Sequence, residues 1–162
     1  MGSIEIAKTS VVAMIGVWMV LVAITNVFDY GTNFAFVQHV MSMDTTFGRP
    51  GVMWRAIGST PLHHAAYITI IMWELVGGLL CLGGAVMLAR AIGRTPREFD
   101  EAKTVAVAGL AVAVALWTVA FLIVGGEWFV MWQSAQWNGQ QAAFRSSVMT
   151  LIALVWLAQR DS

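Results

Sequence analysis

Three ionisable side chains fall in or beside long apolar stretches and are the groups best placed to do chemistry. Glu74 lies near the middle of the apolar stretch 61–89, Arg145 lies just inside the stretch 142–158, and Glu127 lies close after the stretch 104–124. An ionisable side chain in hydrocarbon is costly and usually faces a bundle interior, where it binds a ligand, carries a proton or pairs with an opposite charge. Because an unpaired charge there is worse than a paired one, the sequence favours an ion pair of Arg145 with Glu74 or Glu127.

Other polar side chains extend this group toward the outer end of the expected helices. The predicted buried polar cluster consists of Glu74, Glu127, Arg145, His63, Gln141, Asn26 and Asp29, and the outer loop adds Asn33, His39 and Asp44. The inner half of the helices is expected to be aliphatic. The cluster either locks the helices together or forms a pocket that opens to the outside. A continuous ion or proton path is disfavoured, because no polar side chain follows Glu74 toward the inner face.

Histidines and methionines in the first loop raise the question of a metal. His39, Met41 and Met43 could form a soft-metal site, since imidazole and thioether suit copper. Their spacing is not specific, however, and clustering is expected in a chain with ten methionines. Paired haem ligands would have to come from His39, His63 and His64, all near one surface. We therefore predict no metal site and no cofactor, with a bound lipid or quinone as the open alternative.

The familiar signatures of catalysis are missing from the sequence. It has no nucleophile–base pair, no phosphate-binding glycine loop and no zinc-protease helix. The single cysteine, Cys81, excludes an internal disulfide and a paired-thiol redox site. An enzymatic role would rest on the carboxylates alone, so a non-enzymatic role is favoured.

The composition indicates a membrane protein. Of the 162 residues, 59% are hydrophobic and only 11% are charged, which is too few charges to coat a soluble domain of this size. The formal net charge is zero, so nothing suggests a nucleic-acid partner. The lipid bilayer is the first partner that the sequence predicts.

Four segments are long enough to span a bilayer, given the roughly 20 residues that a helix needs. Within one domain of residues 1–162, the spans are 9–28, 61–89, 104–124 and 142–158, and the connections are 29–60, 90–103 and 125–141. Basic residues concentrate in 90–103 and near both termini, so the positive-inside rule predicts these in the cytoplasm and the other two connections outside. The first span is too long for a signal-peptide core, and we expect it to remain as an anchor.

These segments predict an all-α fold: a four-helix transmembrane bundle with a short amphipathic helix in the first outer loop. Small residues at intervals of four in the last three spans let helix backbones approach closely. The amphipathic helix is expected to pack over the bundle mouth with Phe34, Phe36, Val37, Val40, Met41 and Met43. In the third connection, Trp128, Trp132 and Trp137 are typical of an interfacial aromatic belt, or alternatively of a wall that contacts a ligand such as a quinone.

The sequence also resembles a known family over nearly the whole chain. The resemblance rests on the run NFAFVQHVMSMDTTF (33–47), on Arg55-Ala56-Ile57 with His63, Tyr67 and Glu74, and on GEWF (126–129) and WQS (132–134). These residues are similar to those of a bacterial family of predicted small integral membrane proteins of unknown function. The resemblance implies a four-helix protein of the bacterial cytoplasmic membrane, and it assigns no activity and no catalytic residue.

Three functional hypotheses follow. The first is an accessory or interaction subunit of a larger membrane complex, such as a respiratory assembly, or a self-associating protein, because the chain is small and lacks a path across the membrane. The second is an outward-facing small-molecule or quinone site centred on Glu74, Glu127 and Arg145. The third is periplasmic copper handling through His39, Met41 and Met43.

Overall fold

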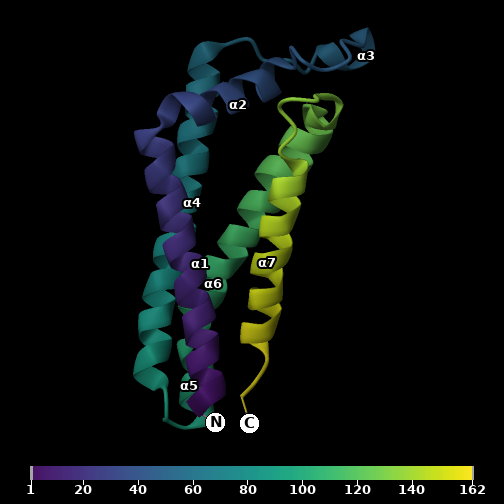
Figure 1. Ribbon diagram of the computed structural model, residues 1–162. Coiled ribbons are helices and arrows are strands. Elements are labelled where there is room, and N and C mark those ends of the chain that lie inside the picture. Colours follow the sequence, from purple (N-terminus) through teal and green to yellow (C-terminus); the bar gives the residue numbers. More distant parts are fainter. Residues whose placement is uncertain (1, 162) are drawn as a thin grey trace.

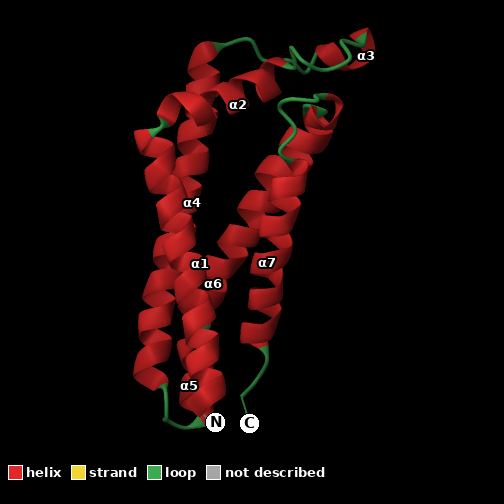
Figure 2. Cartoon of the chain, viewed as in Figure 1, coloured by secondary structure: helices red, strands yellow, loops and turns green. Residues whose placement is uncertain are grey.

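A computed structural model describes residues 2–161 as a bundle of long helices (Figures 1 and 2). In chain order the elements are α1 (Gly2–Phe28), α2 (Tyr30–Ser42), α3 (Pro50–Met53), α4 (Thr60–Ala91), α5 (Pro96–Ala102), α6 (Thr104–Ala115), η1 (Leu116–Trp128), η2 (Met131–Gln133) and α7 (Gln140–Ala158). Both chain ends and α5 lie at one end of the bundle, which we call the terminus end, and α2 and α3 lie at the opposite, loop end (Figure 1).

The predicted four-span architecture is confirmed. Four helices are long and apolar enough to cross a membrane: α1, α4, the continuous pair α6 and η1, and α7. The helix that contains the predicted span 9–28 already begins at Gly2, because its early polar side chains are bonded inside the protein. Glu5 accepts a hydrogen bond from the backbone N–H of Gly93 at 2.9 Å, and Lys8 donates to Asp161 at 2.9 Å.

The predicted helix in the first loop is α2, which lies across the loop end of the bundle (Figure 1). Its buried side chains are Val37 and Val40, and both point into the apolar interior beneath it. The helix is capped by Met43, whose N–H bonds to the carbonyls of His39 and Val40 and whose positive φ of 54° turns the chain out of the helix. This helix therefore covers the mouth of the bundle.

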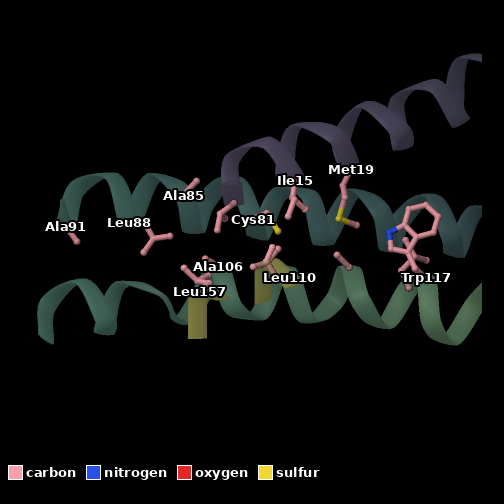
Figure 3. Close-up of a cluster of buried hydrophobic side chains, with 14 of the residues drawn as sticks. Ile15, Met19, Cys81, Ala85, Leu88, Ala91, Ala106, Leu110, Trp117 and Leu157 are labelled. Carbon is pink, nitrogen blue, oxygen red and sulfur yellow. The ribbon is translucent and has the colours of Figure 1, made fainter. Parts of the chain in front are cut away.

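Small residues bring α4 close to α6 in the terminus-end half of the bundle. A Cβ on Gly84 would lie 2.4 Å from the backbone nitrogen of Ala106, and one on Gly109 would lie 2.6 Å from that of Cys81. Only glycine fits at such distances. Figure 3 shows the side chains that fill the remaining space between these helices and α1, including Cys81, Leu88 and Leu110.

Bulky residues separate the same two helices in the loop-end half. The Trp73 indole of α4 donates to the carbonyl of Val112 at 3.1 Å, and Trp117 stacks on Trp18 of α1 at a centroid distance of 5.6 Å. From Leu116, the residue before Trp117, the third span continues as η1, a wider π-helix with bonds such as Phe129 N–H to Val124 O. Figure 1 shows η1 and α7 diverging from α1 and α4 toward the loop end.

A buried ionic network that was not predicted closes the terminus end, beyond the aliphatic inner half of the predicted spans. Lys103 bonds to Asp100, to Asp161 and to the carbonyl of Gln159. Lys8 bonds to the same Asp161 and the same carbonyl. Sequence reasoning missed this network because its acids and lysines lie outside or at the edge of the predicted spans. The network ties the segment after α7 to α1 and α5.

Candidate functional site

Glu74 lies at the interface of α1 and α4, near the middle of the membrane-spanning part. Its side chain is 2% exposed, and its Oε2 accepts a hydrogen bond from the Asn26 amide at 2.8 Å. Among residues 2–161, no basic side chain forms an ion pair with it. Burying an isolated ionised carboxylate costs far more than burying the neutral acid, so this surrounding suits a neutral carboxyl that accepts one amide bond.

Asn26 links this carboxyl to the loop-end surface. The exposed Asn33 of α2 donates to the side-chain oxygen of Asn26 at 2.9 Å, and the Tyr67 hydroxyl donates to the backbone carbonyl of Asn26 at 3.0 Å. The line Asn33, Asn26, Glu74 therefore runs from the surface into the α1–α4 interface. The predicted members Glu74 and Asn26 are brought together, and the loop residue Asn33 joins them.

An aromatic wall lies beside this line, and sequence reasoning missed it. The Tyr30 hydroxyl and the Nδ1 of His64 are 2.8 Å apart, and the His64 ring stacks on Phe34 at a centroid distance of 4.0 Å. Tyr30 also meets Tyr67 edge to face at 4.7 Å. The sequence did contain a signal for this wall. Tyr30 and Phe34 have the i,i+4 spacing, and His64 and Tyr67 the i,i+3 spacing, that places two side chains on the same face of a helix.

The prediction of a buried position is wrong for Glu127, Arg145, Gln141 and Asp29, which are all exposed. The predicted ion pair of Arg145 with Glu74 or Glu127 is also wrong, since Arg145 forms none within residues 2–161. The divergence of η1 and α7 explains the missing ion pair, because η1 carries Glu127 and α7 carries Arg145 away from the α1–α4 interface where Glu74 lies. A long arginine near a helix end can instead extend to the polar layer.

His63 is buried as predicted, but its side chain bonds to the first loop and not to Glu74. Its Nε2 lies 2.6 Å from the carbonyl of Ile57, and its Nδ1 is buried without a hydrogen-bond partner. The N–H of Ile57 in turn donates to Met41 O at 2.8 Å. His63 therefore holds the end of the first loop against α4 and α2.

The residues of the hypothesised copper site, His39, Met41 and Met43, have different surroundings. His39 bonds through Nδ1 to Asp44 at 2.7 Å and stacks on Trp137 at 4.5 Å. Met43 is buried in a cluster with Met131, whereas Met41 is partly buried. In the described residues 2–161 there is no group of three or more His, Cys, Asp or Glu able to hold a metal ion. Of the predicted aromatic belt, Trp128 and Trp132 are exposed and Trp137 is half-buried.

The divergence of η1 from α4 leaves an apolar groove beneath α2. Its volume is about 270 Å³. It is lined by Phe36, Val37, Val40, Met41, Ala66, Thr69, Ile70, Trp73, Val119, Ala120, Phe121, Val124, Gly125, Phe129 and Met131. Its polar side chains are already occupied: the Thr69 hydroxyl donates to Ala65 O at 2.8 Å and the Trp73 indole to Val112 O. Sequence reasoning did not find this groove, although the change from small to aromatic residues along α4 and the third span was visible.

Comparison with known proteins adds one finding. The searches of curated proteins and of solved structures return no match. The family of predicted small integral membrane proteins (DUF2165) matches residues 4–160. Because the match covers almost the whole chain, this protein belongs to the family of predicted small integral membrane proteins (DUF2165).

Proposed function

We propose that this protein binds the hydrocarbon chain of a membrane lipid in the groove between α4 and η1. The observation that carries the proposal is an apolar space of about 270 Å³, walled by transmembrane helices and covered by α2. Small-molecule sites span roughly 300 to 1,000 Å³, so this groove is at the lower limit and suits a chain better than a bulky ring system.

The depth of the groove supports a lipid chain as its occupant. On α4 its lining runs from Ala66 to Trp73, which is roughly 9 to 20 Å below Thr60 at 1.5 Å per residue. The 32 residues of α4 form a helix about 48 Å long, which is longer than the hydrocarbon core of about 30 Å is thick. The ends of α4 therefore extend into the polar layers. The groove then lies at the depth of the acyl chains, which are the most abundant apolar groups there.

A quinone ring is less suited to the groove than a chain. A quinone carbonyl needs a hydrogen-bond donor, and among the described residues that line the groove, Thr69 and Trp73 donate to backbone carbonyls instead. Phe36, Phe121 and Phe129 offer only apolar surface. The same groove can hold the isoprenoid tail of a quinone, since a tail requires no polar partner.

A partner subunit is the other possible occupant of this surface. In an accessory role within a larger complex, the partner would insert side chains into the groove or would bind to other surfaces. That outcome is one result of the experiment below.

Native mass spectrometry of the gently extracted protein tests the proposal. We expect the wild type to retain one phospholipid, and Ala66→Leu to reduce that retention strongly, because Ala66 lines the groove and the larger side chain fills it. Ala65→Leu is the matched control, since the neighbouring Ala65 is exposed and does not line the groove. Retention that is equal in the two variants, or a co-purified subunit crosslinked at Ala66 in place of lipid, would overturn the proposal.

The proposed setting is the bacterial cytoplasmic membrane, with both termini and α5 in the cytoplasm. Basic residues support this orientation: Lys8, Arg90, Arg94, Arg97, Lys103 and Arg160 belong to the terminus end. Arg49, Arg55 and Arg145 belong to the loop end. The excess at the terminus end follows the positive-inside rule.

A further inference from the structure

The segment 45–59, which we call the aromatic arm, extends from α2 across the loop end and carries α3. Figure 1 shows α3 at the loop end, to one side of the bundle. The arm is attached at both ends of its course. Thr45 donates to Ser134 Oγ at 2.8 Å, the Phe47 N–H donates to Gln133 Oε1 at 3.0 Å, and Ile57 bonds to Met41. An attached segment can present its side chains in a fixed arrangement.

The arm exposes large aromatic side chains beside those of the third connection. Phe47 and Trp132 meet edge to face at 6.0 Å, and Trp54 and Trp128 do the same at 5.6 Å. The exposed fractions of these four side chains range from 46% for Trp128 to 68% for Trp54. Tryptophan at the end of a transmembrane bundle is typical of the headgroup layer, where the ring is apolar and its N–H remains hydrated.

Arg55 lies beside both tryptophans with incomplete hydrogen bonding. Its guanidinium carbon is 5.6 Å from the Trp54 ring centroid and 5.2 Å from that of Trp128. Its Nη1 makes only long bonds of 3.4 Å to the carbonyls of Glu127 and Trp128, and its Nε has no partner. A guanidinium has five N–H donors, so most of its donor capacity is unused by the protein.

Charge in this region favours an anion. The aromatic arm contains Arg49 and Arg55 and no acidic residue. Within residues 2–161, neither arginine forms an ion pair. Arg55 contacts the acidic residue Glu127 only through its backbone carbonyl, and the single charge of that residue does not cancel the two positive charges. The phosphodiester of a phospholipid offers the oxygen acceptors that a guanidinium binds best.

We propose that Arg55, Trp54 and Trp128 form a headgroup site for an anionic phospholipid at the loop end. The guanidinium binds the phosphodiester, and the two indoles hold the guanidinium in place and contact the upper acyl chains. This site is separate from the groove between α4 and η1 and does not depend on it. Both lipid classes carry the phosphodiester, but the guanidinium repels the quaternary ammonium of phosphatidylcholine, so the site prefers anionic over zwitterionic lipid. The groove, in contrast, distinguishes lipids by their chains.

Titration of the detergent-solubilised protein with phosphatidylglycerol and with phosphatidylcholine, followed by native mass spectrometry, tests this site. We expect tighter binding of phosphatidylglycerol, and Arg55→Gln to reduce that preference about fivefold, the factor that one basic residue at a membrane surface typically contributes. Arg49→Gln is the matched control, because Arg49 is in the same arm without an aromatic cage. Equal losses in the two variants would indicate diffuse charge attraction and overturn the site.

Two further variants keep the test decisive if Arg55→Gln fails to fold. Arg55→Lys keeps the charge but loses planar stacking, and we expect it to fold and to lose most of the preference. Glu127→Gln removes a repulsive carboxylate, so we expect stronger binding of phosphatidylglycerol. If Glu127→Gln instead destabilises the protein and leaves lipid binding unchanged, Arg55 pairs with Glu127 and the headgroup site is wrong. Inorganic phosphate should not compete, because it lacks chains for the indoles.

Discussion

The side-chain amide of Asn26 donates to the Glu74 carboxyl at 2.8 Å. This hydrogen bond links α1 to α4, although the two residues are 48 positions apart in the chain. Glu74→Gln retains an oxygen acceptor, so we expect unfolding free energy close to that of the wild type. Glu74→Leu leaves the amide without its acceptor and should cost about 1 kcal/mol, a typical value for a polar contact between membrane helices. Unfolding in mixed micelles measures both. Equal damage in the two variants would show that an ionised carboxylate is required.

The contact of Gly84 with Ala106 should tolerate no side chain. Gly84→Ala places a Cβ 2.4 Å from a backbone nitrogen, so the helices must move apart, at a cost of about 1 to 3 kcal/mol. The adjacent Gly83 has no atom within 4 Å of a built Cβ, so Gly83→Ala should be neutral or slightly stabilising. The difference between these variants in thermal unfolding is the measurement, and similar melting temperatures would contradict the close packing of α4 on α6.

Trp73 and Trp117 should respond differently to loss of the indole nitrogen. Trp73 donates to Val112 O, whereas the Trp117 Nε1 is buried without a partner. Trp73→Phe should therefore cost about 0.5 to 1.5 kcal/mol more than Trp117→Phe, beyond the similar loss of ring area. Chemical unfolding of the two variants compares them directly. The reverse order would mean that Trp117 has an unseen partner.

The ionic network at the terminus end should make stability depend on pH. The hydrogen bond from Lys103 lowers the pKa of Asp100. Burial raises the pKa of Asp161, but the bonds from Lys103 and Lys8 outweigh it, so the net pKa lies below its ordinary value. Burial likewise lowers the pKa of Lys103, but its bonds to Asp100 and Asp161 raise it above the ordinary value overall.

The sign of the dependence follows from these directions. The carboxylates stabilise the fold fully above their ordinary pKa of 3.8, and this stability is lost as the pH falls through their lower folded-state values. The contribution of Lys103 is present below 10.5 and is lost as the pH rises through its higher folded-state value. We expect Asp161→Asn to weaken the acid-side loss in pH-dependent unfolding. Glu101→Gln, which removes an exposed pair with Arg97, should leave it unchanged.

The orientation can be tested by cysteine labelling. In a Cys81→Ala background, Arg94→Cys should be labelled only after the membrane is made permeable, because α5 is proposed to be cytoplasmic. Phe47→Cys, in the exposed aromatic arm, should be labelled by an impermeant reagent in intact cells. The opposite labelling pattern would reverse the proposed orientation and place the groove near the inner leaflet.

The number of spans, their approximate bounds and the helix in the first loop were predictable from the sequence. Hydropathy and helical period are local properties, so Glu74 could be assigned to a long apolar helix without knowledge of its neighbours. The polar network at the terminus end could not be found this way. Glu5 and Lys8 look like a solvated helix start until Gly93 and Asp161 are brought against them.

The partner of Glu74 was decided only by the tertiary structure. Charge alone favoured Arg145, yet the carboxyl bonds to Asn26, because glycines such as Gly78 let α1 approach α4 at that height while η1 and α7 diverge. The groove has the same origin. The helix α4 packs closely on the third span at Gly84 and is held away from it at Trp73, so a space remains between them at the loop end. The sequence by itself determined which residues belong to the apolar spans. Which of those residues contact one another was decided by the packing of backbones that are distant in the chain.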